Sequence, residues 1–236
     1  MKRIGLLLPV DKILLGLLVA LTAVFFFTDL DMMIQRQVFH PEQEWPLGER
    51  GLWRFMEDYG RAIPVGLAIG ALAVLVLGFV KKWLASYRRA ALLMVLLMLI
   101  GPGLLVDQVL KPYWERPRPH EVEEFGGEYE FVPVWMMGEA GPNSSFPSGH
   151  SSLAFYMMFP YFLFRRRNRP LAYLGLALGI GFGSLMGVAR IFAGMHFATD
   201  VIWAFGVVYL TGLLLSPLCR SDLAGTAPHA QVPQER

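Results

Sequence analysis

Three short segments of the chain carry side chains that could bind and transfer a phosphate group. They are residues 111–119 (Lys-Pro-Tyr-Trp-Glu-Arg-Pro-Arg-Pro), 147–150 (Pro-Ser-Gly-His) and 190–200 (Arg-Ile-Phe-Ala-Gly-Met-His-Phe-Ala-Thr-Asp). A guanidinium group matches two phosphate oxygens, whereas an ammonium acts as a point charge. Histidine can serve as a nucleophile or as an acid near neutral pH. Together the segments predict a phosphate site that contains two histidines.

The first segment has a restrained backbone. Prolines fix the backbone dihedrals around Arg116 and Arg118, so the guanidinium groups project from a stiff chain. Pro112 disfavours helix at the residue before it, and we therefore expect a helix to end at Lys111. Asp107 lies four residues earlier, on the same face of that helix, where it could hold Lys111 in place. Taken alone, such a basic segment is also typical of simple contact with lipid headgroups.

The second segment has the pattern of a helix start. Serines, a proline and then an apolar run follow one another over residues 144–164, which is typical of a capped first turn. Backbone amides at such a start bind anions, and Gly149 leaves room for a phosphate to approach. His150 would lie in that turn. A plain capped helix without a ligand is the alternative.

The third segment pairs a histidine with a carboxylate. His196 and Asp200 are four residues apart, so a helix would bring them within hydrogen-bonding range. A carboxylate that accepts one ring N–H fixes the tautomer and leaves the other nitrogen free to attack. Asp200 also precedes a long uncharged run, where a charge is costly without a partner. The alternative is a His/Asp pair that only caps a membrane helix.

The rest of the chain must place these segments in a membrane. Of the 236 residues, 55% are hydrophobic and only 17% are charged, and a spanning helix needs about 20 apolar residues. The sequence predicts an all-α, polytopic membrane protein in which residues 1–220 form one domain of six transmembrane helices and residues 221–236 form a disordered cytoplasmic tail. The first apolar run is expected to be retained rather than removed as a signal peptide, because Asp11 and Lys12 interrupt it. The six uncharged runs are 13–28, 62–80, 90–106, 151–164, 171–189 and 201–219.

Positive charge predicts the orientation of these helices. Lysine and arginine accumulate in cytoplasmic loops, and in a six-span arrangement most of them fall on one side. All three segments then lie on the other side, at the periplasmic interface of a bacterial inner membrane. The basic clusters are short inner loops, so nucleic acid is not an expected partner. The residues on the basic side are Lys2, Arg3, Lys81, Lys82, Arg88, Arg89, Arg165, Arg166, Arg167, Arg169 and Arg220.

The loop between the first two spans contains a predicted amphipathic helix, residues 49–61. Its apolar residues recur at spacings of three and four, with charged residues opposite. Such a helix either lies in the membrane interface or packs over the other loops.

The order Lys-x6-Arg-Pro, Pro-Ser-Gly-His and Arg-x5-His-x3-Asp resembles the motifs of the type-2 phosphatidic acid phosphatases, membrane lipid phosphatases related to vanadium haloperoxidases. The resemblance implies that His196 attacks phosphorus and forms a phosphohistidine, with Asp200 orienting it. It also implies that His150 protonates the leaving oxygen and then activates water, and that no metal or other cofactor takes part. One departure is Ala189, where the family commonly has serine. The residues implied to bind the phosphoryl group are Lys111, Arg118, Arg190, the Ser148 hydroxyl and the Gly149 amide.

The implied substrate is a phosphomonoester or pyrophosphate of a membrane lipid. Candidates are lipid A, phosphatidate, phosphatidylglycerol phosphate and undecaprenyl pyrophosphate, and residues 100–126 are similar to bacterial lipid A 4'-phosphatases. A lipid-to-lipid phosphotransferase could use the same phosphohistidine. A noncatalytic protein that binds or transports lipid phosphates would need the cations but not the two histidines. A soluble haloperoxidase relative is disfavoured by the six apolar runs.

Overall fold

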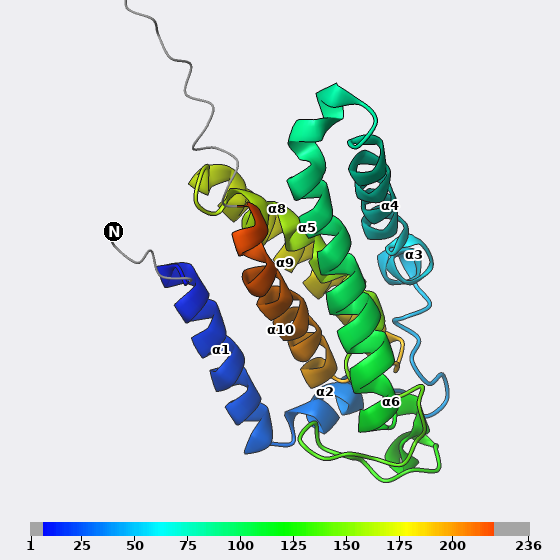
Figure 1. Ribbon diagram of the computed structural model, residues 1–236. Helices are drawn as coiled ribbons and strands as arrows, with labels where there is room; N and C mark the ends of the chain where they lie inside the picture. Colours follow the sequence, from blue (N-terminus) through cyan, green and yellow to red (C-terminus); the bar gives the residue numbers. More distant parts are fainter. Residues whose placement is uncertain (1–6, 220–236) are drawn as a thin grey trace, which may run out of the picture.

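The protein is a bundle of helices, as the composition predicts. The computed structural model describes residues 7–219, and no β-strand occurs in this range. Figure 1 shows the long helices packed side by side. The all-α fold class is therefore confirmed. The long elements are α1 (Pro9–Phe26), α4 (Ala62–Leu77), α5 (Arg88–Met98) continued by the π-helical η2 (Leu99–Leu110), α9 (Arg169–Phe192) and α10 (Ala198–Leu215), which the 3-10 turn η6 (Ser216–Cys219) follows.

Within residues 7–219, five segments are long and apolar enough to cross a membrane. They are Pro9–Phe26, Gly51–Leu77, Lys82–Glu121, Arg169–Phe192 and Ala198–Leu218.

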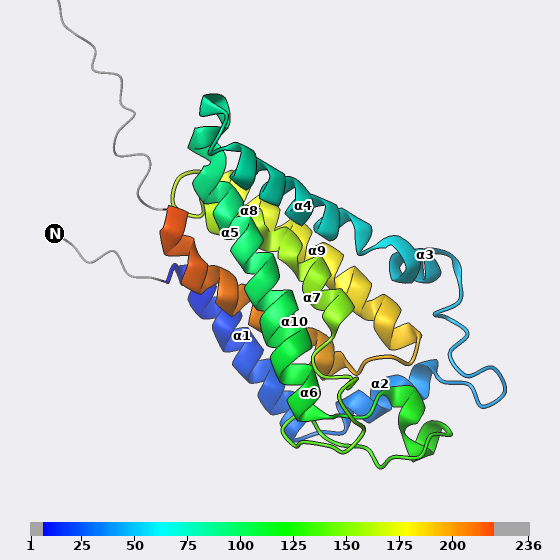
Figure 2. The same cartoon turned by 45° about the vertical axis from the view of Figure 1, so that its right-hand side comes forward.

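The remaining predicted span, residues 151–164, is broken into three short elements. These are α7 (Gly149–Phe155), the 3-10 turn η5 (Tyr156–Met158) and α8 (Phe159–Phe164), with Pro160 in the first turn of α8. The broken segment packs closely on α9 at Gly179. A Cβ atom built on this glycine would lie only 2.4 Å from the Met158 backbone nitrogen. Figure 2 shows α7 and α8 running along α9. The predicted span 151–164 is therefore a broken helix that packs closely on α9.

The predicted end of the third span at Lys111 is wrong. The helix continues through α6 (Lys111–Trp114), and Glu115 ends it in a left-handed conformation with φ of 48°. Proline is tolerated in the first turn of an α-helical segment. The hydrogen-bonding pattern changes from π to α at Lys111, so Pro112 falls in such a first turn.

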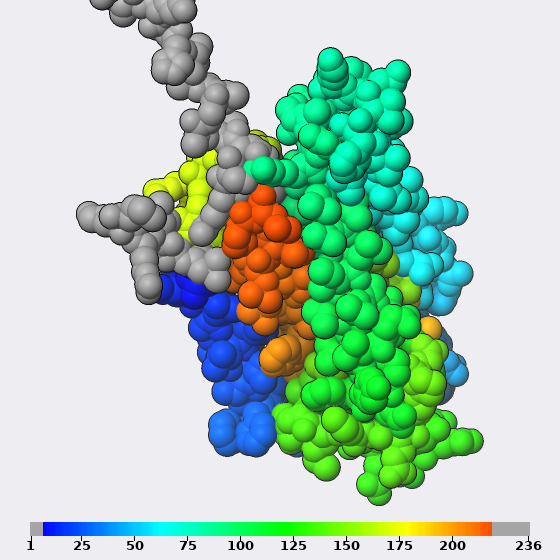
Figure 3. Space-filling view, viewed as in Figure 1, coloured from blue at the N-terminus to red at the C-terminus, as the bar shows by residue number. Residues whose placement is uncertain are grey.

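The two ends of the bundle differ in what closes them. At one end lie the α4–α5 turn and residues 165–168, which carry many of the expected cytoplasmic charges. At the other lie α2 (Leu30–Val38), α6 and the long segment 115–148, which forms much of the lower end of the molecule in Figure 3. We call this second end the site end. The expected charges Lys2, Arg3 and Arg220 and the predicted tail 221–236 lie outside the described residues.

Helix α1 is anchored by a buried carboxylate near the end opposite the site. The Asp11 side chain is fully buried and accepts hydrogen bonds from Tyr161 at 2.5 Å and Tyr209 at 2.6 Å. Arg165 forms an ion pair with the same carboxylate. Because an isolated buried charge is costly, these partners fix where α1 docks.

The predicted interface helix is present as α3 (Gly51–Tyr59). Met56 is buried and packs in one cluster with Met186 and Ala189 of α9. Leu52, Phe55 and Tyr59, from the same predicted apolar stripe, are exposed. Helix α3 therefore packs on the bundle and also presents an apolar surface outward.

Candidate active site

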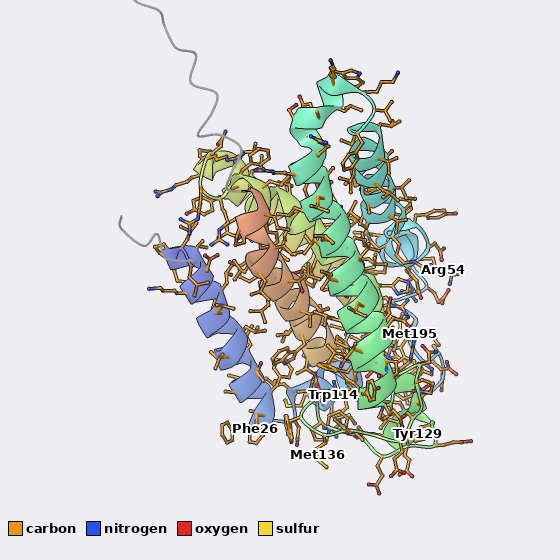
Figure 4. The ribbon with its side chains drawn as sticks, in the orientation of Figure 1. Phe26, Arg54, Trp114, Tyr129, Met136 and Met195 are labelled. Atoms are coloured by element: carbon orange, nitrogen blue, oxygen red, sulfur yellow. The ribbon has the colours of Figure 1, made fainter. Side chains whose placement is uncertain are left out.

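The three segments meet at the site end of the bundle. A Cβ atom built on Gly149 would lie 3.1 Å from the Lys111 Nζ atom, so the first two segments touch. The Ser148 backbone N–H donates to the Asp200 carbonyl at 3.2 Å, which joins the second segment to the third. Arg118 Nη1 lies 3.4 Å from the sulfur of Met195, which Figure 4 labels at this end. The topology thus assembles one site from distant parts of the chain.

The second segment forms the predicted helix start. Ser148 is the N-cap of α7, its buried hydroxyl accepts from the Ser151 N–H at 3.4 Å, and His150 lies in the first turn. Pro147 precedes the cap instead of lying within the turn. Gly149 is buried beside the Lys111 ammonium, where a side chain would crowd it. The segment therefore places a helix start next to a cation.

Each of the three expected phosphate-binding cations has a defined position. Lys111 Nζ lies 3.6 Å from Asp107 Oδ1, as the four-residue spacing predicted. Arg118 donates to Asn143 through Nε, at 3.2 Å to the carbonyl, and through Nη2, at 2.8 Å to the side-chain oxygen. The charges of Arg118 and Arg190 both act on Lys111, so the three cations share one electrostatic environment. Such a group suits an anion with several oxygens.

Arg190 is the most buried of these cations. Its Nη1 pairs with the Glu57 carboxylate of α3. Its Nε is buried and has no hydrogen-bond partner among residues 7–219. A buried donor without a partner is uncommon and points to a missing acceptor. A phosphate oxygen would supply that acceptor.

His196 is held in one tautomer by a backbone carbonyl. The ring is 1% exposed, and Nδ1 lies 2.8 Å from the Ser145 carbonyl oxygen. Because a carbonyl can only accept, Nδ1 carries the proton and Nε2 keeps its lone pair. Gln35 Nε2 donates to the His196 carbonyl at 2.9 Å, so the backbone is held as well.

The expected hydrogen bond from His196 to Asp200 is replaced by this bond to Ser145. The Nδ1 atom lies 3.6 Å from Asp200 Oδ2. The physical reason is that α10 begins at Ala198, so His196 precedes the helix that was expected to align the pair. Asp200 Oδ2 instead accepts from the Phe197 N–H at 2.8 Å. Asp200 therefore acts on the ring through its charge.

Both histidines are kept neutral by their surroundings. Burial lowers the pKa of His196 to about 4; the charges of Arg190 and Arg118 act in the same direction, and Asp200 opposes them. Burial also lowers the pKa of His150, with further contributions from Arg190 and Arg61. A neutral His196 is the form that can attack phosphorus.

Sequence reasoning missed Arg116, which is fully buried beneath the site. Its Nη1 donates to Asp200 Oδ1 at 2.6 Å and to the Thr199 hydroxyl at 2.9 Å. Its Nη2 donates to Asp31 Oδ2 at 2.8 Å, and its Nε to the Val132 carbonyl at 2.8 Å. The two arginines of the Arg-Pro-Arg-Pro run look alike in the sequence. Only the fold separates the fully buried Arg116 from Arg118.

Sequence reasoning also missed Glu57 and Asp31. Each pairs with an arginine that is far away in the sequence. No spacing pattern could have identified these partners.

The apolar helices and the comparisons with known proteins together define a phosphatase that acts on lipids. The chain belongs to the PAP2 superfamily, whose family model matches residues 90–220. It is 31% identical to a lipid A 4'-phosphatase of Francisella tularensis subsp. novicida over 207 residues, which cover 84% of this chain and 91% of the relative.

Two further relatives match about half of the chain. A lipid A 4'-phosphatase of Rhizobium leguminosarum is 36% identical over 50% of each chain. A phosphatidylglycerophosphatase B of Bacillus subtilis is 32% identical over 55% of this chain and 57% of its own. No solved structure matches the chain.

The described residues contain no group of three or more His, Cys, Asp or Glu side chains placed to hold a metal ion. That the reaction needs no metal stays a prediction.

Proposed function

We propose that the protein hydrolyses a phosphate ester or pyrophosphate of a membrane lipid through a phosphohistidine on His196. The observation that supports this best is the hydrogen bond from His196 Nδ1 to Ser145, at 2.8 Å. It leaves Nε2 as a neutral nucleophile in the environment of Arg118 and Arg190. A protein that only bound phosphate would need the cations but no oriented ring.

The cations would bind the phosphoryl group before the reaction. Lys111, Arg118 and Arg190 would contact its oxygens, with the Ser148 hydroxyl and the Gly149 amide at the helix start. Phosphoryl transfer is accelerated mainly by positioning and by stabilisation of charge. The unpartnered Nε of Arg190 supports this assignment.

The chemistry then proceeds in two displacements. His196 Nε2 attacks phosphorus, the bond from phosphorus to the lipid oxygen breaks, and His150 gives that oxygen a proton. His150 next takes a proton from water, whose oxygen attacks phosphorus and breaks the bond to Nε2. Burial, with smaller contributions from nearby cations, lowers the pKa of His150 in the free protein. The negative charge of the bound phosphate would raise that pKa again, so His150 would take up a proton from solvent before the first step.

We also propose that the chain crosses a bacterial inner membrane six times, with α7, η5 and α8 as the fourth crossing. Residues 1–220 would then form one domain with the site end in the periplasm, followed by a cytoplasmic tail. The positively charged residues near 81–89 and 165–169 lie at the opposite end, which supports this orientation,.

Lipid A bearing a 4'-phosphate is the substrate that the comparisons favour. The lipid A 4'-phosphatase from Francisella aligns over most of both chains. Phosphatidate, phosphatidylglycerol phosphate and undecaprenyl pyrophosphate are the other substrates to test.

The experiment measures phosphate release by purified protein in detergent from each of these four lipids. We expect release from lipid A that EDTA leaves unchanged, and no release by His196→Ala. His40→Ala is the matched control, because His40 is exposed and lies outside the site. Full activity of His196→Ala, or loss of activity on metal removal, would contradict the mechanism. Transfer of phosphate to an added lipid acceptor, without release, would identify a phosphotransferase.

A further inference from the structure

We propose that Arg116, together with Asp31, is a positioning residue for His196. Arg116 holds the two acceptor groups that flank the His196 Nδ1 atom, which are the Ser145 carbonyl and the Asp200 carboxylate. The proposal rests on the function proposed above, and it concerns residues outside the three phosphate-binding motifs.

Arg116 reaches the nucleophile first through its backbone. The Arg116 carbonyl accepts from the Ser145 N–H at 2.8 Å. The Ser145 carbonyl in turn accepts from His196 Nδ1 at 2.8 Å. The position of Arg116 therefore sets the position of the carbonyl that selects the tautomer of His196.

The second connection runs through the side chain. Arg116 Nη1 donates to Asp200 Oδ1 at 2.6 Å, and the other oxygen of that carboxylate lies 3.6 Å from His196 Nδ1. The guanidinium is also packed against the Phe197 ring, 4.4 Å from its centroid. Because Arg116 is fully buried, it has little freedom to let the carboxylate move.

Asp31 gives the cluster of Arg116, Asp31 and Asp200 a net negative charge. Arg116 carries one positive charge, and Asp31 and Asp200 each carry one negative charge, so the cluster has a net charge of −1. Without Asp31, the charge of Arg116 would neutralise that of Asp200, and the pair would have no net charge. Phosphorylation or protonation at Nε2 makes the His196 ring positive, and a net negative charge nearby stabilises that state.

Thr199 completes the cluster. Its hydroxyl donates to Asp31 Oδ2 at 2.5 Å and its backbone N–H donates to Asp31 Oδ1 at 3.0 Å. Thr199 also accepts from Arg116. Both carboxylates and the guanidinium are thus hydrogen-bonded in one geometry, as buried ions require. Lysine could not reproduce it, because an ammonium lacks the planar fork that spans Asp31 and Asp200.

The test is a double-mutant cycle with Arg116→Lys and Asp200→Asn. It measures kcat, normalised to the amount of folded protein, and KM. We expect Arg116→Lys to lower kcat at least about tenfold and to change KM less than about twofold, because Arg116 does not touch the substrate. In the Asp200→Asn background, Arg116→Lys should lower kcat by less than about threefold, since residues that act together are not additive. Wild-type kcat in Arg116→Lys, or effects that multiply, would overturn the proposal.

Asp31→Asn provides the second variant if Arg116→Lys does not fold. It should also lower kcat about tenfold, because it leaves Arg116 to neutralise Asp200. Asp11→Asn is the matched control, since Asp11 is also a buried carboxylate and pairs with an arginine at the other end of the bundle. Its kcat per folded molecule should equal that of the wild type. Unchanged kcat in Asp31→Asn, or an equal loss in Asp11→Asn, would contradict a specific role.

A measurement without substrate separates this proposal from the proposed function. In ¹⁵N spectra of histidine-labelled protein, the signals of His196 are identified by their absence from His196→Ala. We expect the Nδ1–H tautomer in the wild type and a mixture of tautomers in Arg116→Lys or Asp31→Asn. A wild type that releases no phosphate would refute the function alone, whereas unchanged tautomers in folded variants would refute the positioning role.

Discussion

The ring of His196 is neutral although a carboxylate lies 3.6 Å away. Burial disfavours the charged ring more strongly than Asp200 favours it, and two arginines add to the effect. A nucleophilic imidazole must keep its lone pair, so this balance serves the proposed attack. The carboxylate stabilises the ring most strongly when the ring acquires positive charge during the reaction.

We therefore predict that His196 titrates near pH 4 in the free protein, instead of near its ordinary value of 6.5. A pH titration of its ¹⁵N signals measures this directly. Asp200→Asn should lower the midpoint further, because the Asp200 charge raises the pKa. Between pH 6.5 and 4 the His196 side chain binds a proton in the unfolded chain but not in the folded protein. Its contribution to the free energy of unfolding should therefore decrease as the pH falls from 6.5 towards 4. A midpoint near 6.5 in the folded protein would contradict the assignment.

At the scale of the element, α3 brings Glu57 to the buried Arg190. This contact places a carboxylate against a cation that we expect to bind phosphate. Substrate must then compete with Glu57 for one face of the guanidinium. Helix α3, which also exposes Leu52, Phe55 and Tyr59, thus takes part in the affinity of the site.

Glu57→Gln should lower KM for the lipid phosphate by about threefold or more, because an uncharged amide competes less well for Arg190. Steady-state kinetics in detergent measure the change. Glu49→Gln is the control, since Glu49 is exposed, precedes α3 and pairs with Arg54 of that helix. A higher KM in Glu57→Gln would show that Glu57 orients Arg190 instead of competing with phosphate.

Element positions were predictable where composition alone determines them. The predicted runs 62–80 and 171–189 correspond to α4 and α9. The interruption at residues 156–158 was not predictable, because it depends on how α9 packs against Met158. In the site, the cations and both histidines follow from local motifs. The pairing of Arg116 with Asp31, 85 residues away, exists only in the folded chain.

At the scale of the whole molecule, the proposed orientation can be tested by labelling single cysteines. In a Cys219→Ser background, Glu128→Cys should react with a membrane-impermeant maleimide added outside the inner membrane, and Arg169→Cys should not. Both positions are exposed and lie at opposite ends of the bundle. The charge distribution gives this expectation its direction. The reverse pattern, or equal labelling of both positions, would exclude the six-span topology with the site in the periplasm.

The buried carboxylate of Asp11 has a consequence for the order in which the molecule can be completed. Its hydroxyl partners Tyr161 and Tyr209 follow it by 150 and 198 residues. A ribosome therefore makes α1 long before the groups that neutralise and hydrogen-bond its carboxylate. Helix α1 can take its final place only after Tyr209 of α10 has been synthesised.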